Sequence, residues 1–239
     1  MKILATSDWH VDALTDGVPR WEETEAIINH TVDVAIAEHV ELYLMLGDLC
    51  DPDGWNSVRA IAKTLEVAGR LADADIASVW VAGNHDVVED GNGTTMLSPL
   101  AASQLATHVF EQPAEICICP NGNIPLRLVG LPFTPSSHAY DPVKVVRSFG
   151  REKRNEHTIV LGHLNLEGIS AGSETKEMVR GREVFWPLDV IAKRWPNATL
   201  LGGHYHRAQE FKGVHVIGSL ARLKHNEEDS EPSMLFLEV

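Results

Sequence analysis

Short apolar runs rich in β-branched residues alternate along the chain with longer segments whose apolar residues recur at helical spacing. This pattern predicts strands at 2–6, 42–46 and 76–82, with helices at 22–38 and 56–70 between them. A strand–helix–strand–helix–strand opening is typical of parallel strands joined by covering helices. We therefore expect an α/β fold.

The rest of the chain is less regular. A Gly- and Asn-containing turn at 120–123 lies between two apolar runs and predicts a hairpin. Later segments alternate predicted helices, strands and loops, and the acidic run 227–231 is typical of a solvated turn. No linker, repeat or charge block divides the chain, so one domain over 1–239 is expected. The remaining predicted elements are a short helix at 97–105, hairpin strands at 114–119 and 126–131, a helix at 142–153, a strand at 158–161, a long loop through 168–181, and strands and turns from 199 to a final strand at 234–239.

Composition excludes several classes of protein. With 44% apolar and 23% charged residues in 239 positions, the chain has enough apolar surface to form a core. A formal net charge of −14 counts against binding nucleic acid through a broad basic surface. Three cysteines without a CxxC pair suggest neither a disulfide framework nor a thiolate zinc site. No signal peptide or membrane span is recognisable, so we expect a cytoplasmic protein without a membrane partner.

Five polar motifs follow predicted strands directly. Because the carboxyl ends of strands in open α/β sheets line the ligand crevice, residues far apart in sequence can converge there. The glycines within the motifs allow close backbone approach or a positive φ. In chain order, the motifs are Asp8-Trp9-His10, Gly47-Asp48, Gly83-Asn84-His85-Asp86, Gly162-His163 and Gly203-His204-Tyr205-His206.

Taken singly, most of these motifs have simpler explanations. The first is typical of a helix cap with a surface histidine, the second of a turn, and the fourth of a hydrogen-bonded core or loop histidine. The fifth is more specific, because two histidines separated by one residue can reach one metal ion from a tight loop. The order of all five, each after an apolar run, indicates a shared metal site.

Together the motifs resemble the pattern D-x-H, GD-x-x-D, GNH-D/E, GH and GH-x-H of the calcineurin-like metallophosphoesterase superfamily. The resemblance covers nearly the whole chain. It implies a four-layer αββα sandwich of two mixed sheets flanked by helices. It also implies that one ion is held by Asp8, His10, Asp48 and His206, and a second by Asp48, Asn84, His163 and His204.

The chemistry of this ligand set agrees with the resemblance. Mixed nitrogen and oxygen ligands with a shared carboxylate suit two divalent ions about 3.5 to 4 Å apart, and we expect manganese, with iron or zinc as alternatives. A water bridging two such ions loses a proton near neutral pH and can attack phosphorus. The ions also attract phosphate to an acidic protein.

Three further residues are predicted to act in catalysis. His85 adjoins the ligand Asn84 and is expected to donate a proton or a hydrogen bond to the departing oxygen. Asp86 would orient the His85 ring, or it is a structural turn carboxylate. Asp51 would support the metals or His85 from behind, unless it caps a helix.

Finer features resemble the SbcD-like DNA-repair nuclease subunits, which work with an SMC-type ATPase. The segments that carry this resemblance are 47–51, 128–135, 162–168, 203–209 and 218–222. Members that cut DNA continue into a capping domain beyond the length of this chain. The resemblance implies a DNA or nucleotide phosphodiester substrate, an SMC-type ATPase partner and a homodimer as candidate partners.

Substrate-binding residues are less marked. Arg207 and Arg222, with Lys224, could meet a nucleic-acid backbone, and Trp9 could stack on a base or pack in the core. The leading hypothesis is a nuclease. One alternative is a phosphodiesterase or phosphatase for nucleotides or other small phosphoesters, because the metal centre does not dictate the rest of the substrate. Another is a metal-dependent scaffold.

Overall fold

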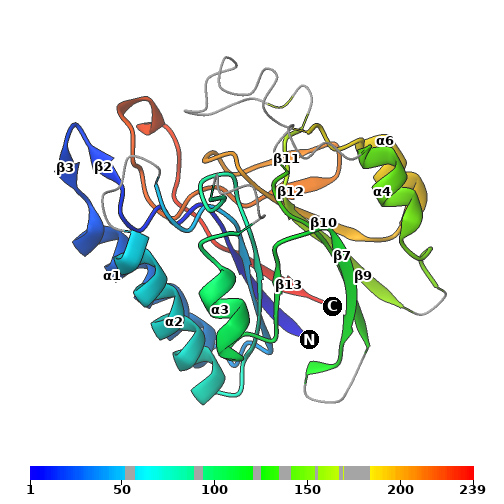
Figure 1. Cartoon of the computed structure of the whole chain (residues 1–239), viewed down its shortest axis with the longest axis horizontal. Helices are drawn as coiled ribbons and strands as arrows, with labels where there is room; N and C mark the ends of the chain where they lie inside the picture. Colours follow the sequence, from blue (N-terminus) through cyan, green and yellow to red (C-terminus); the bar gives the residue numbers. More distant parts are fainter. Residues whose placement is uncertain are drawn as a thin grey trace.

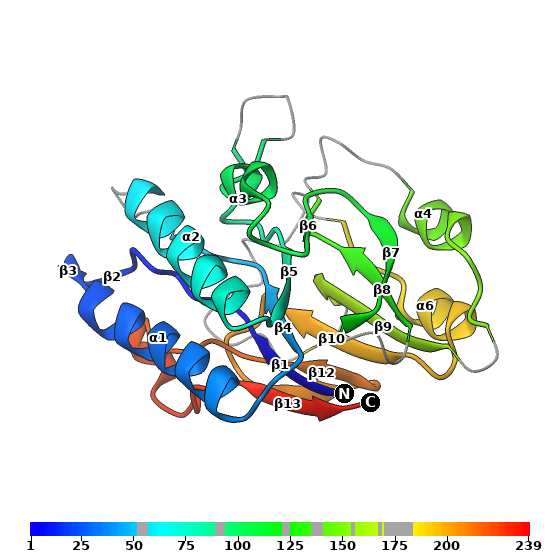
Figure 2. The ribbon, with the colours of Figure 1, turned by 90° about the horizontal axis from the view of Figure 1, so that it is seen from below.

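Two β-sheets pack face to face in the computed structural model of the chain, and helices cover the outer face of each (Figures 1 and 2). The structure describes residues 1–51, 57–88, 94–120, 125–134, 141–153, 156–166, 169 and 184–239. Figure 2 shows α1 and α2 outside one sheet and α4 and α6 outside the other. The expected αββα arrangement of two mixed sheets is therefore confirmed.

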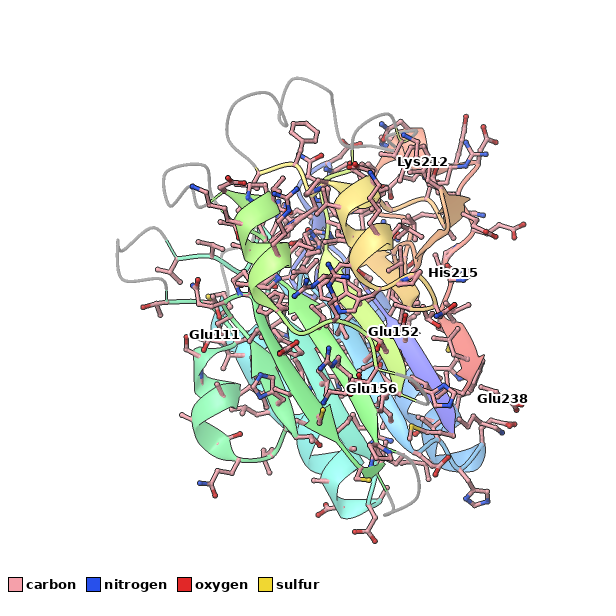
Figure 3. The ribbon with its side chains drawn as sticks, turned by 90° about the vertical axis from the view of Figure 1, so that its right-hand side faces the viewer. Glu111, Glu152, Glu156, Lys212, His215 and Glu238 are labelled. Atoms are coloured by element: carbon pink, nitrogen blue, oxygen red, sulfur yellow. The ribbon has the colours of Figure 1, made fainter. Side chains whose placement is uncertain are left out.

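The first sheet has five strands in the order β13-β1-β4-β5-β6, and all but β13 are parallel to their neighbours. Figure 3 places Glu238 and Glu111 at opposite margins of the molecule, as expected for residues of β13 and next to β6, the two edge strands. The elements are β1 (Lys2–Thr6), α1 (Trp21–Ala37), β4 (Leu42–Leu46), α2 (Ser57–Asp73), β5 (Ala77–Val81), α3 (Ser98–Ser103), β6 (His108–Phe110) and β13 (Leu235–Glu238).

The second sheet has six strands in the order β11-β12-β10-β9-β8-β7. Its four central strands are parallel, and both edge strands are antiparallel. A small hairpin, β2 (Leu14–Thr15) with β3 (Val18–Pro19), and the 3-10 helix η3 (His225–Glu227) lie outside both sheets. The elements of the second sheet are β7 (Ala114–Ile118), β8 (Leu126–Leu131), α4 (Pro142–Ser148), β9 (His157–His163), α6 (Leu188–Arg194), β10 (Thr199–Gly203), β11 (Gln209–Phe211) and β12 (Val214–Val216).

Three apolar layers hold the sandwich together. Successive residues of a strand face opposite sides of the sheet. In β4, Tyr43 therefore packs against α1 and α2, whereas Leu44 packs against the other sheet. On the far side, Val160 of β9 packs with Ile191 of α6 and Trp195. Strands buried on both faces appear as continuous apolar runs in the sequence, which is why their positions were predictable.

The structure differs from expectation where elements are short. The helix predicted at 142–153 ends at Ser148, because Phe149 is extended and its ring lies beside that of Trp195. Strand β6 and helix α6 were not predicted, since three and seven residues carry little periodicity. Residues 121–124 at the tip of the predicted hairpin, and the loop 168–181 apart from residue 169, lie outside the described residues. In the part of the chain that is described, no helix has the length and apolar composition needed to cross a bilayer.

Candidate metal centre

The carboxyl ends of β1, β4, β5, β9 and β10 converge on one edge of the sandwich, where all five polar motifs lie. Contacts between motifs show the convergence directly. The nitrogen Nε2 of His10 lies 3.0 Å from Nε2 of His206, across 196 positions of sequence. The structure thus brings together the seven residues predicted as ligands, which come from both sheets: Asp8, His10, Asp48, Asn84, His163, His204 and His206.

Unusual backbone angles aim several of these side chains into the centre. Asp8, His10, Asp48 and His204 have φ values of 51°, 44°, 56° and 85°. Non-glycine residues rarely adopt a positive φ, and each instance costs about 1 to 3 kcal/mol. Hydrogen bonds between the loops hold the strained backbone, since the Asp8 amide donates to Gly47 and the His10 amide to Asp48. Strain of this kind collects at functional sites.

Glycines at the strand ends let the loops approach closely. A Cβ on Gly47, where φ is +94°, would lie 2.9 Å from the Cα of Gly83. A Cβ on Gly203 would overlap Ser7 Oγ and the Leu46 carbonyl. These glycines are therefore needed for packing between motifs, and Gly47 also for its backbone angle.

The first ligand cluster consists of Asp8, His10 and His206, whose ligand atoms all lie within 4.8 Å of one another. Ligands placed about 2.1 Å from an ion at right angles to each other are about 3 Å apart. The 3.0 Å between the two histidine nitrogens matches that spacing. All three residues are buried, so this cluster has the composition and dimensions of a divalent-metal site.

The second ligand cluster consists of Asn84, His163 and His204. The Asn84 oxygen Oδ1 lies 2.9 Å from His163 Nε2 and 3.0 Å from His204 Nδ1, and the two nitrogens are 3.2 Å apart. These mutual distances match the spacing of ligands on one face of an octahedral shell about 2.1 Å from an ion. This cluster also fits a divalent cation.

Asp48 lies between the two clusters. Its Oδ2 is 3.3 Å from His163 Nε2 in the second cluster and 3.8 Å from His10 Nε2 in the first. Its Oδ1 accepts a hydrogen bond from the His85 amide, which orients the carboxylate. A single oxygen facing both clusters is the arrangement that a bridging ligand requires.

The histidine rings are oriented by hydrogen bonds behind the centre. Nδ1 of His10 lies 3.1 Å from the Cys50 carbonyl, and Nδ1 of His163 lies 2.9 Å from the Leu46 carbonyl. Because a carbonyl only accepts, each Nδ1 donates, so in the neutral ring Nε2 carries the lone pair that a metal requires.

Burial and mutual charge shift the pKa values strongly. Burial opposes the charge on Asp48, but the neighbouring His163 and His85 outweigh it and hold the pKa of Asp48 well below its usual range. Burial likewise opposes charge on His163, yet Asp48 raises the pKa of His163 to about 10. Burial, reinforced by His163, lowers the pKa of His204 to about 3. Perturbations of this size are typical of functional sites.

His85 lies beside the clusters, with Nε2 3.8 Å from Asp48 Oδ2 and its side chain 17% exposed. Nδ1 of His85 is buried and has no hydrogen-bond partner among the described residues. The expected orientation of this ring by Asp86 is therefore not found. The Asp86 carboxylate instead accepts hydrogen bonds from the amides of Asp48, Leu49 and Gly83, which makes it the structural turn carboxylate of the alternative interpretation.

Asp51 lies behind the first cluster, with Oδ2 3.8 Å from His10 Nδ1, and its amide donates to Asp12. Among the described residues, Asp51 caps no helix, since the next described helix, α2, is given from Ser57. Trp9 is 1% exposed, and its Nε1 donates to Thr6, so a base-stacking role for Trp9 is wrong and core packing is right.

Arg207 and Arg222 are exposed, as expected for residues that could meet a phosphate backbone. Arg222 donates from Nε to the Ser230 carbonyl.

One residue predicted to be exposed to solvent contacts the centre instead. Glu227, expected in a solvated turn, is 1% exposed, and its Oε1 lies 2.6 Å from Nδ1 of His206. The residues Leu220, Ala221 and Leu223 just before it are apolar, and the structure buries all three. Their apolar character was the sequence signal that this segment packs inward.

Comparisons with known proteins agree with this geometry. A family model described as calcineurin-like phosphoesterase matches residues 1–208. A segment of 87 residues is 31% identical to the DNA double-strand break repair protein Mre11 of Saccharolobus solfataricus, and it covers 36% of this chain and 23% of that protein. In fold, the chain is similar to a dimetal phosphatase from Danio rerio, with a TM-score of 0.54 and 13% identity over 92% of this chain and 87% of that one. It is also similar to a protein of Thermus thermophilus, with a TM-score of 0.53 and 14% identity over 91% and 89% of the two chains.

Proposed function

From the premise that this chain belongs to the calcineurin-like phosphoesterase family, we propose that it uses two divalent metal ions to hydrolyse small phosphoesters such as nucleotides. The chain is a metal-dependent phosphoesterase. The observation that carries the dinuclear proposal is the single oxygen of Asp48 facing two separate ligand clusters. Its buried histidine and carboxylate ligands suit manganese, iron or zinc.

Each residue has a role in this proposal. Asp8, His10 and His206 would hold one ion, Asn84, His163 and His204 would hold the other, and Asp48 would contribute to both. The bound ions would activate water and neutralise charge on the phosphate. His85, partly exposed beside Asp48, donates a proton or a hydrogen bond to the leaving oxygen.

The described surface favours a small substrate over duplex DNA. Binding a nucleic-acid backbone requires several phosphate contacts from Lys or Arg, and the chain carries a net charge of −14. Burial of Trp9 removes the predicted stacking platform. The dimetal phosphatase similarity supports the fold of such an enzyme.

A nuclease is the second candidate, because the Mre11 segment is 31% identical to this chain. Under that hypothesis an SMC-type ATPase and a second copy of the chain would be partners. The matched segment spans 23% of that relative, so both partners are proposed for this chain only under the nuclease hypothesis.

The proposal is tested by manganese-dependent hydrolysis of bis-p-nitrophenyl phosphate, p-nitrophenyl phosphate, nucleotides and labelled DNA by the same preparation. We expect turnover of the small esters, and a loss of about 10²- to 10⁴-fold in His85→Ala with both ions retained by calorimetry. His157→Ala, at the exposed opposite end of β9, is the matched control. Cleavage of DNA alone would favour the nuclease, and a metal-loaded protein inert toward every ester would favour a scaffold.

A further inference from the structure

Glu227 is a buried carboxylate in a segment of otherwise exposed acids. It ends η3 and is 1% exposed, whereas the neighbouring Glu228, Asp229 and Glu231 are exposed. Burying a carboxylate is strongly unfavourable unless hydrogen bonds or charges compensate it. The contacts of Glu227 therefore indicate why it is buried.

Its two oxygens have different partners. Oε2 accepts the backbone amides of Leu223, at 2.7 Å, and Lys224, at 3.2 Å. Oε1 lies 2.6 Å from Nδ1 of His206. Glu227 thus connects the segment after β12 with the ligand loop after β10.

The ionised carboxylate accepts but cannot donate, so the proton of a neutral His206 ring belongs on Nδ1. Nε2 then carries the lone pair, and this is the nitrogen that faces His10 Nε2 at 3.0 Å. The other two histidines that present Nε2, His10 and His163, are held by neutral carbonyls. His206 is the member of this trio whose Nδ1 lies at hydrogen-bond distance, 2.6 Å, from a carboxylate, whereas the Asp51 carboxylate lies 3.8 Å from Nδ1 of His10. A charged acceptor makes the ring a stronger donor to a metal.

We infer that Glu227 is a positioning residue that fixes the ring and tautomer of His206 and thereby strengthens the binding of the ion in the first ligand cluster. The inference rests on the proposed dinuclear centre. The contacts of Glu227 predict that the effect is one-sided. Its Oε1 lies against His206 of the first cluster, whereas Asp8 and Asp48 lie within reach of residues in both clusters and so do not distinguish them.

The substitution Glu227→Gln keeps the shape of the side chain but changes its charge and the tautomer that it favours in His206. The amides of Leu223 and Lys224 require an acceptor, so they orient the glutamine oxygen toward themselves. The NH₂ group then faces Nδ1 of His206, which must accept, and the ring proton moves to the metal-binding Nε2. The variant therefore keeps the side-chain volume but favours the wrong tautomer.

The experiment is calorimetric titration of manganese into the chelator-treated full chain, with the unfolding temperature of the metal-free protein measured in parallel. We expect Glu227→Gln to lower the affinity for one of the two ions about 10- to 100-fold and to leave the affinity for the other near its wild-type value. Glu228→Gln, an exposed neighbour, is the matched control and should bind both ions as the wild type does.

A second measurement tests the tautomer of His206 in the wild-type protein, without a substitution at Glu227. In the zinc-loaded wild type labelled with ¹⁵N-histidine, NMR should show the His206 ring proton on Nδ1, with its assignment resting on its loss in His206→Gln. A proton on Nε2 would overturn the inference even if Glu227→Gln does not fold. If Glu227→Gln binds both ions normally, the inference fails and the proposed function stands. If the wild type binds no ion, both fail.

Discussion

Two aspartates three positions apart on the same loop have different environments in the centre. Asp48 directs one oxygen toward both ligand clusters, 3.3 Å from His163 and 3.8 Å from His10. Asp51 approaches only the far side of the His10 ring, where Oδ2 lies 3.8 Å from Nδ1. Because Nδ1 is not the nitrogen facing the clusters, we expect Asp51 to influence a bound ion only through the His10 ring.

Asp48→Asn should therefore lower the affinity for both ions. Asp51→Asn should lower the affinity for the first ion alone, and by much less. The asparagine retains an oxygen but removes the negative charge that both cations share. Calorimetric manganese titration of the two variants measures the difference. Equal losses in the two variants would contradict the bridging role of Asp48.

At the scale of elements, the ends of the strands determine the site. The loops after β1, β4 and β10 meet because Gly47, directly after β4, and Gly203, at the end of β10, place no side chain between them. Gly203, the last residue of β10, is packed against Ser7 and the Leu46 carbonyl. By contrast, Gly69 in α2 has open space where a Cβ would lie. These two glycines have opposite expected responses to a methyl group.

Gly203→Ala should destabilise the metal-free protein by about 1 to 3 kcal/mol, because the Leu46 backbone carbonyl and the buried Ser7 side chain must move to admit the methyl group. Gly69→Ala should stabilise it by about 0.5 to 1 kcal/mol, since alanine loses less entropy in a helix. Urea unfolding of both variants measures the free energies. A stable Gly203→Ala protein with unaltered metal affinity would show that the loops can separate without consequence.

At the scale of the whole molecule, the centre joins the two sheets. Asp8, Asp48 and Asn84 follow strands of the five-stranded sheet, whereas His163 and His204 belong to the six-stranded sheet or follow it. An ion bound by residues from both sheets binds the folded sandwich and not the unfolded chain. Binding energy therefore adds to folding stability.

Removal of metal should lower the unfolding temperature. At a free concentration 100 times its dissociation constant, one ion contributes about 2.7 kcal/mol. For a chain of this length, that corresponds to roughly 5 to 10 °C. Differential scanning calorimetry with manganese and with chelator measures the shift. An identical unfolding temperature under both conditions would contradict a metal that connects the sheets.

The sequence by itself determined the long elements and the set of converging residues. Strands such as 42–46 are buried on both faces, so they appear as uninterrupted apolar runs. Polar residues directly after such runs must lie at the carboxyl edge of a parallel sheet. Asp8, Asp48 and His163 could therefore be placed without coordinates, because their position follows from local pattern and the direction of the strands.

Only the tertiary structure decided which partners the polar atoms have. Asp86 adjoins His85 in sequence, yet its carboxylate accepts amides of the loop after β4. Glu227 lies in an acidic run, yet it contacts a histidine 21 positions away. Trp9 lies between two predicted ligands, yet its ring is in the core beside Trp80. In each case, the hydrogen-bond or packing partners are distant in the chain. The spacing of neighbouring residues in the sequence does not indicate which distant groups the fold brings into contact.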